Sequence, residues 1–262
     1  MPRYLRLFLA QLRISLLVSA QYRVDFLVDG AIEILWTSTA LAPLIVVFAS
    51  RDRIAGWSFG EALIVVGFFT LLQALLEGVL NPSFVAVAEH VRKGTLDYVL
   101  LLPADAQFLV STGRFHVWRS VNVLTAAGIF VVGFRELGRA PTLASAAFGL
   151  TLFAVAAILM HSLWTLAMCT VFYAVKADQI TDVLSATLDA SRWPSSVFRG
   201  GTRLVLTFVV PLGLMTTVPA RAFLGDEGVL LPCVALLEAV ALALIARVVW
   251  RRAIARYTSA SS

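Results

Sequence analysis

Long apolar runs constrain this chain more than any other feature of its sequence. A transmembrane helix needs roughly 20 predominantly apolar residues, and six runs reach about that length. They cover residues 26–49, 59–80, 110–134, 143–175, 204–224 and 228–250. Only 14% of the residues are charged, against about 25% in soluble domains. We therefore expect an all-α membrane protein with six transmembrane helices.

Residues 1–24 are expected to form an amphipathic helix that lies in the membrane interface. Arg6 and Arg13 are seven residues apart and share one helix face, with Arg3 nearby on the same side. Leucine and phenylalanine side chains are then left to face the lipid. The alternative is a ragged start to the first span. Residues 25–262 form the six-span transmembrane domain.

The distribution of basic residues predicts the orientation, because lysine and arginine favour the cytoplasmic ends of membrane helices. With both termini placed in the cytoplasm, 16 of the 21 lysines and arginines fall inside and five fall in outer loops. These basic residues are scattered over the ends of the apolar runs, which is typical of contacts with lipid headgroups. We exclude a nucleic-acid partner on this ground.

One charged, turn-containing stretch, EHVRKGTLDYVLLLPADAQF at residues 89–108, separates the second and third apolar runs. Within it, RKGTLDYVLLLP resembles the signature of ABC-2 type permeases, in which a charged-Gly-Thr-Leu-acidic run ends in L-L-x-P before the third span. The likeness extends to the N-terminal helix, the six spans and VPARAFLG at 218–225. The string SRWPSSVFRGGTRLVLTFVVP resembles bacterial exporters whose permeases come as two related subunits.

The resemblance implies the membrane subunit of a bacterial ABC exporter in the inner (cytoplasmic) membrane, for drugs, cationic toxicants, peptides or lipids. It also implies a second permease, related or identical, and two copies of an ATP-binding subunit. Residues 82–106 would be a cytoplasmic coupling segment whose helix docks into that subunit. The expected contact residues are Glu89, His90, Arg92, Lys93, Thr95 and Asp97, with Gly94 supplying the turn. The alternative is a solvated loop held near headgroups by Arg92 and Lys93.

We expect a transport subunit without an ATPase site of its own. Neither Lys93 nor Lys176 belongs to a G-x-x-x-x-G-K-[ST] loop. The three histidines, His90, His116 and His161, are scattered, so no catalytic or metal site is expected. ATP and Mg²⁺ would bind to the partner ATPase, and this chain would bind no cofactor.

Acidic residues within the apolar runs indicate a candidate substrate path, because a charge at the centre of a membrane helix costs about 2.5–3.5 kcal/mol. Asp25, Asp29 and Glu33 are spaced by four and share one face of the first span, and Glu77 lies near the cytoplasmic end of the second. These acids either pair with Arg114 and Arg119 or line a path for a cationic or amphipathic cargo. An ion-coupled secondary transporter that works without an ATPase is the alternative function, and it would use the same acids to bind ions.

Residues 178–224 allow two assignments of the fifth span. Hydropathy and the charge rule favour 204–224, whereas the resemblance favours a polar span at 178–198. We favour the second assignment, in which a re-entrant element broken by Pro211 and Pro219 precedes the sixth span. Asp182 and Asp189 would then share one face of a central helix and line the substrate path. In a cytoplasmic loop they would only be solvated.

Overall fold

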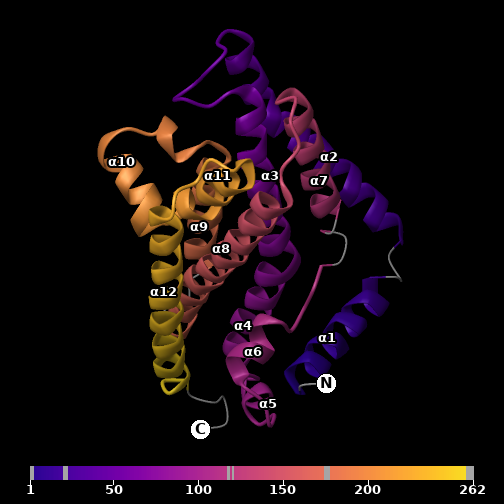
Figure 1. Cartoon of the computed structure of the whole chain (residues 1–262). Coiled ribbons are helices and arrows are strands. Elements are labelled where there is room, and N and C mark those ends of the chain that lie inside the picture. The colour runs from indigo at the N-terminus through magenta and orange to yellow at the C-terminus, as the bar shows by residue number, and fades with distance from the viewer. Residues whose placement is uncertain (1–2, 20–22, 117–118, 120, 174–177, 258–262) are drawn as a thin grey trace.

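The computed structural model describes residues 3–19, 23–116, 119, 121–173 and 178–257, and the regular elements in these ranges are helical (Figure 1). The N-terminal half contains α1 (Arg3–Ser19), α2 (Arg23–Ala49), α3 (Phe59–Leu75), the π-helical turn η1 (Leu76–Leu80), α4 (Asn81–Lys93), α5 (Asp97–Leu100), α6 (Ala106–Ser111) and α7 (Val121–Glu136). The C-terminal half contains α8 (Leu143–Cys169), η3 (Thr170–Phe172), α9 (Asp178–Leu188), η4 (Asp189–Arg192), η5 (Ser195–Val197), α10 (Gly200–Leu204), η6 (Val205–Val209), η7 (Gly213–Thr217), α11 (Val218–Leu224) and α12 (Leu230–Ile254).

Four helices in these described ranges are long and apolar enough to cross a membrane. They are Gly30–Ala49, Phe59–Lys93, Leu143–Phe172 and Leu230–Ile254. A fifth candidate is a helix pair, Gly200–Val209 and Gly213–Leu224, which is bent by 70° at its break. The prediction of an all-helical membrane protein is therefore confirmed, with four or five candidate spans where the sequence predicted six.

The predicted third span at 110–134 is wrong as a single helix. α6 ends at Ser111 and α7 begins at Val121, and the described residues TGRFH at 112–116, between the two helices, are not helical. Hydropathy averaged over residues 110–134 does not reveal this break in the helix. α7 alone has 16 residues, which corresponds to about 24 Å of helix, less than the roughly 30 Å of a bilayer core.

The long helix Phe59–Lys93 continues past a proline. Pro82 has no N–H, so it cannot donate to the carbonyl of Gly78 four residues earlier. That carbonyl instead accepts the His116 N–H at 2.9 Å, and the Ser83 hydroxyl donates to the Arg114 carbonyl at 3.0 Å. The π-helical turn η1 precedes the proline. The connection between α6 and α7 is thereby anchored to the long helix.

Residues 178–224 run from the end of the molecule near α4 to the opposite end, at the α2–α3 loop. η3, just before α9, contacts α4 and α12. By Ser196 the chain has reached the α2–α3 loop, where the Trp57 indole N–H donates to the Ser196 hydroxyl at 2.9 Å. Arg221 lies over the Trp57 ring, 5.4 Å from its centroid. Ser196, just before the bent pair, and Arg221, near its end, therefore both contact the α2–α3 loop.

The two assignments of the fifth span can be compared with this geometry. Neither is one straight helix, because α9 has 11 residues and the 204–224 run is bent. Pro211 lies at the bend, as predicted, but Pro219 lies inside the continuous helix Gly213–Leu224, so the predicted break there is wrong. Pro219 is tolerated because it stands in the first turn of α11, directly after the π-helical turn η7.

The start of α1 and the end of α12 lie at the same end of the molecule as α5, at the bottom of Figure 1. The α2–α3 loop, α10 and α11 lie at the opposite end. The start of α1 and the end of α12 therefore lie at the end of the molecule that carries the predicted coupling segment. Cytoplasmic termini remain a prediction from the charge distribution.

α3 and α7 pack closely because glycines face each other. A Cβ atom added to Gly133 would lie 2.9 Å from the Ile64 Cδ1 atom and 3.2 Å from the Gly60 carbonyl oxygen. Small residues at such contacts let membrane helices approach, and dispersion between the closely packed helices then holds them together. Gly128, also on α7, is exposed and would meet nothing within 4 Å.

We therefore expect Gly133→Val to destabilise the fold by about 1–3 kcal/mol, because it overpacks the α3–α7 contact. Thermal unfolding of the purified protein in detergent measures this effect as a lower midpoint. Gly128→Val is the matched control on the same helix and should leave the midpoint close to wild type. Equal midpoints for the two variants would contradict the packing described here.

Candidate functional site

A tight turn ends α4 in the predicted coupling segment. Gly94 has φ +67°, the left-handed conformation that glycine adopts at helix ends. The Thr95 N–H donates to the His90 carbonyl at 2.9 Å, and the His90 Nδ1 and Thr95 Oγ1 atoms are 2.8 Å apart. Gly94 thus supplies the turn that was predicted. His90 and Thr95, which were predicted as contact residues, brace this turn.

The charged residues of the predicted coupling segment differ in their exposure and in their pairing. Lys93 and Glu89 form an ion pair one turn apart, with 2.6 Å between the Nζ and Oε1 atoms, and their side chains are 65% and 41% exposed. An exposed pair of this kind adds little to stability. Arg92 is exposed, and Asp97 is half-buried in the first turn of α5. Arg92 and Lys93 are therefore the exposed basic residues of the coupling segment.

Three apolar side chains at the tip were missed by the sequence reasoning. Tyr98, Leu101 and Leu102 are 74%, 81% and 51% exposed, while Leu96 is fully buried. We refer to Tyr98, Leu101 and Leu102 as the apolar tip. Exposed apolar side chains that cluster at a polar end of a molecule are typical of binding surfaces. The signal was present as LDYVLLLP, where α5 is too short to bury every apolar residue.

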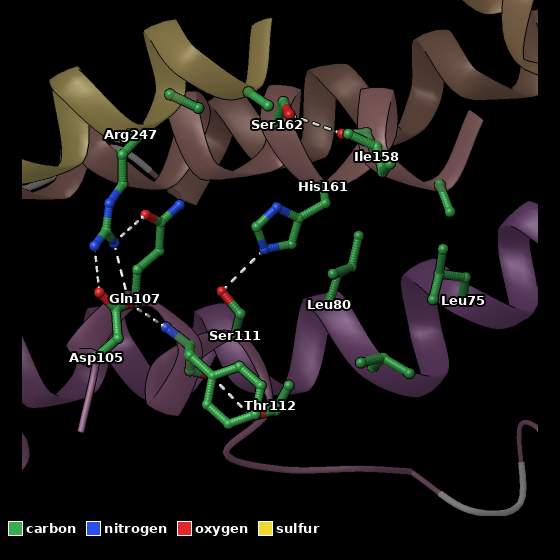
Figure 2. A pocket seen from close by; sticks show the side chains of 15 residues that line it. Leu75, Leu80, Asp105, Gln107, Ser111, Thr112, Ile158, His161, Ser162 and Arg247 are labelled. Atoms are coloured by element: carbon green, nitrogen blue, oxygen red, sulfur yellow. Dashed lines mark hydrogen bonds and ion pairs between the residues drawn. The ribbon is translucent and has the colours of Figure 1, made fainter. Parts of the chain in front are cut away.

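α6 is tied to α12 and α8 by side chains (Figure 2). The Arg247 guanidinium of α12 binds both carboxylate oxygens of Asp105 and donates to the Gln107 Oε1 atom at 2.8 Å. Asp105 also caps α6 by accepting the Phe108 N–H at 3.0 Å. The hydrogen bond from Arg247 holds the pKa of the Asp105 carboxyl below its usual range, although partial burial opposes this shift.

The opposite side of α6 contacts α1. The Thr112 hydroxyl donates to the Gln11 Oε1 atom at 2.7 Å, and the Phe115 N–H donates to the Ser15 hydroxyl at 3.2 Å. Tyr4 packs edge-on against Phe108. Elsewhere on α1, apolar side chains are exposed, which suits a helix that lies against lipid. They include Leu5, Leu9, Ile14, Leu16, Leu17 and Val18.

A cavity of about 630 Å³ lies between α2, α3 and the η4 turn. Two of the acids predicted for the substrate path, Glu77 and Asp189, line this cavity although 112 positions separate them in the sequence. The structure therefore brings these two residues together. The side chains of Asp25, Asp29, Glu33 and Asp182 lie outside the described residues.

Both acids of the cavity are paired with arginine. The Arg119 Nη1 and Glu77 Oε2 atoms are 2.8 Å apart, and the Arg192 Nη2 and Asp189 Oδ1 atoms are 2.9 Å apart. Arg119 was one of the two predicted partners of the membrane acids, and Arg192 was not considered. The Arg192 guanidinium also stacks over the Phe69 ring, 4.9 Å from its centroid.

The rest of the cavity lining mixes aromatic and neutral polar side chains, including Trp36, Trp193, Gln73 and Thr70. Aromatic faces suit apolar or cationic groups, and the paired charges suit polar groups of either sign. In the part of the chain that the structure describes, no group of three histidine, cysteine, aspartate or glutamate residues could hold a metal ion.

Residues 34–261 match the family model described as ABC-2 family transporter protein. No curated protein and no solved structure matched the chain. The match includes the whole α4–α6 segment and all the described residues that line the cavity between α2, α3 and η4. Since it covers most of the sequence, the chain belongs to the ABC-2 transporter family.

Proposed function

We propose that this chain is the permease subunit of an ATP-driven ABC exporter. Membership of the ABC-2 family supports a membrane component of an ABC transporter that associates with ATP-binding subunits. The observation that carries the proposal is the apolar tip of Tyr98, Leu101 and Leu102, which is exposed beside Arg92 and Lys93. This end of the molecule has both the apolar and the basic side chains that a docking surface needs.

In this proposal the apolar tip enters the ATP-binding subunit, and Arg92 and Lys93 pair with acidic residues around the contact. Exposed aromatic and leucine side chains supply most of the binding energy of such an interface, and the surrounding charges orient it. The Gly94 turn, braced by His90 and Thr95, holds the tip in one position. ATP and Mg²⁺ bind to the partner, of which two copies serve two permeases.

The substrate path is the cavity beside α2. Only 6% of the candidate span Gly30–Ala49 in α2 is buried. Trp36 lines the cavity, and 66% of its surface remains exposed. A second permease, related or identical, would cover this face and close the cavity. Because the lining joins aromatic faces with two ion pairs, we propose an amphipathic cargo that enters from the cytoplasm or the inner leaflet.

We expect the double variant Tyr98→Ala/Leu101→Ser to lose about tenfold or more of its affinity for the ATP-binding subunit, because it removes the centre of the proposed contact. Purification of the tagged permease from its host in mild detergent, with quantification of the co-purified ATPase, measures this loss. Leu143→Ser, an equally exposed apolar residue that starts α8, is the control. Equal recovery with both variants would refute the docking surface.

We also expect Glu77→Gln and Asp189→Asn to reduce the stimulation of ATP hydrolysis by transported amphiphiles, with basal hydrolysis unchanged. Each substitution removes one negative charge from the cavity and breaks an arginine–carboxylate ion pair. A panel of cationic, zwitterionic and anionic amphiphiles on the reconstituted complex provides the measurement. Asp226→Asn breaks the exposed pair with Arg139 outside the cavity and serves as the control. Stimulation that all three variants retain would exclude this cavity as the path.

A further inference from the structure

A second cavity, of about 530 Å³, separates α6 from α8 and α12. Its walls are mostly apolar, with Leu75 and Leu80 on the side of the long helix and Ile158 on α8. Whereas α6 packs against α4 and α5, the cavity interrupts its packing against the other two helices. Two polar links bridge this space (Figure 2).

The first link joins α6 to α12. Arg247 of α12 forms a bidentate ion pair with Asp105, the residue that caps α6. Its Nη1 atom also donates to the Gln107 Oε1 atom. Planar guanidinium–carboxylate pairing fixes direction as well as distance. The second link joins α6 to α8, where the Ser111 Oγ and His161 Nε2 atoms are 3.0 Å apart.

The two polar links hold α6 at both of its ends. Asp105 precedes the first residue of α6, and Ser111 is its last residue. A short helix held at both ends moves as one body with the partners that hold it. Because cavity space replaces packing between the links, we expect a displacement of α6 to be transmitted by the links themselves.

Resting on the proposed function, we propose that the Asp105–Arg247–Gln107 cluster, assisted by Ser111–His161, transmits movement of the α4–α6 segment to α12 and α8. Arg247 and Asp105 are then positioning residues of the transport cycle. Docking at the apolar tip moves α5 and α6, and the ion pair carries that movement to the last helix of the chain. The α8–α12 pair follows the ATP-binding subunit by this route.

The native cysteines permit a direct test, because Cys233 on α12 is exposed and Cys169 is buried. The permease is spin-labelled at Cys233, assembled with its ATPase and reconstituted in lipid. The nitroxide spectrum is compared between the nucleotide-free and vanadate-trapped states. Recovery of the ATPase and the rate of ATP hydrolysis are measured on the same samples.

We expect Arg247→Met to bind the ATPase and hydrolyse ATP normally but to lose about fivefold or more of the nucleotide-dependent change at Cys233. Arg247→Lys keeps the charge but cannot form the bidentate pair, so it should give an intermediate response. Ser111→Ala should lower the response less than Arg247→Met. Arg139→Met, which breaks an exposed arginine–aspartate pair with Asp226, is the matched control.

A full response at Cys233 in Arg247→Met would overturn the inference, and so would the absence of a response in wild type that binds ATPase and hydrolyses ATP. If Arg247→Met fails to recover the ATPase, Asp105→Asn decides, because asparagine still caps α6 but cannot form the ion pair. Failure of the wild type to recover any ATPase would contradict the proposed function itself.

Discussion

The continuity of the helix Phe59–Lys93 is the constraint on which both candidate sites depend. Glu77 of the cavity lies on its π-helical turn, and the Glu89–Lys93 ion pair lies at its end. A helix of 35 residues extends for about 52 Å, so one rigid element joins the cavity to the end that carries the apolar tip. This continuity survives Pro82 because the Gly78 carbonyl finds another donor in His116.

The two acids of the cavity between α2, α3 and η4 are each balanced by an arginine. Glu77 and Asp189 each lie within 3 Å of an arginine, and a partly buried carboxylate without such a partner would lose much of its solvation. This pairing changes the interpretation of the acidic residues. A stripe of unpaired acids would favour a simple cation, whereas paired charges among aromatic side chains favour a cargo with both polar and apolar parts. At these two positions an arginine partner would compete with a bound ion.

The sequence predicted local features well. The Gly94 turn follows from glycine's access to positive φ, and the bend at Pro211 follows from the missing N–H of proline. The amphipathic character of α1 was visible in the spacing of its arginines. The errors came from averaging hydropathy over a whole run: the apolar run at 110–134 concealed the non-helical residues 112–116, and the run at 204–224 concealed a bent helix pair.

The sequence by itself determined that this chain is an α-helical membrane protein, because its apolar runs are too long and too numerous for a soluble fold. The RKGTLDYVLLLP motif also identified its family. Only the tertiary structure decided the partners between helices: Glu77 with Arg119, and Asp105 with Arg247 across 142 positions. Hydropathy and spacing report on neighbours along one helix, whereas an ion pair between helices depends on how they pack.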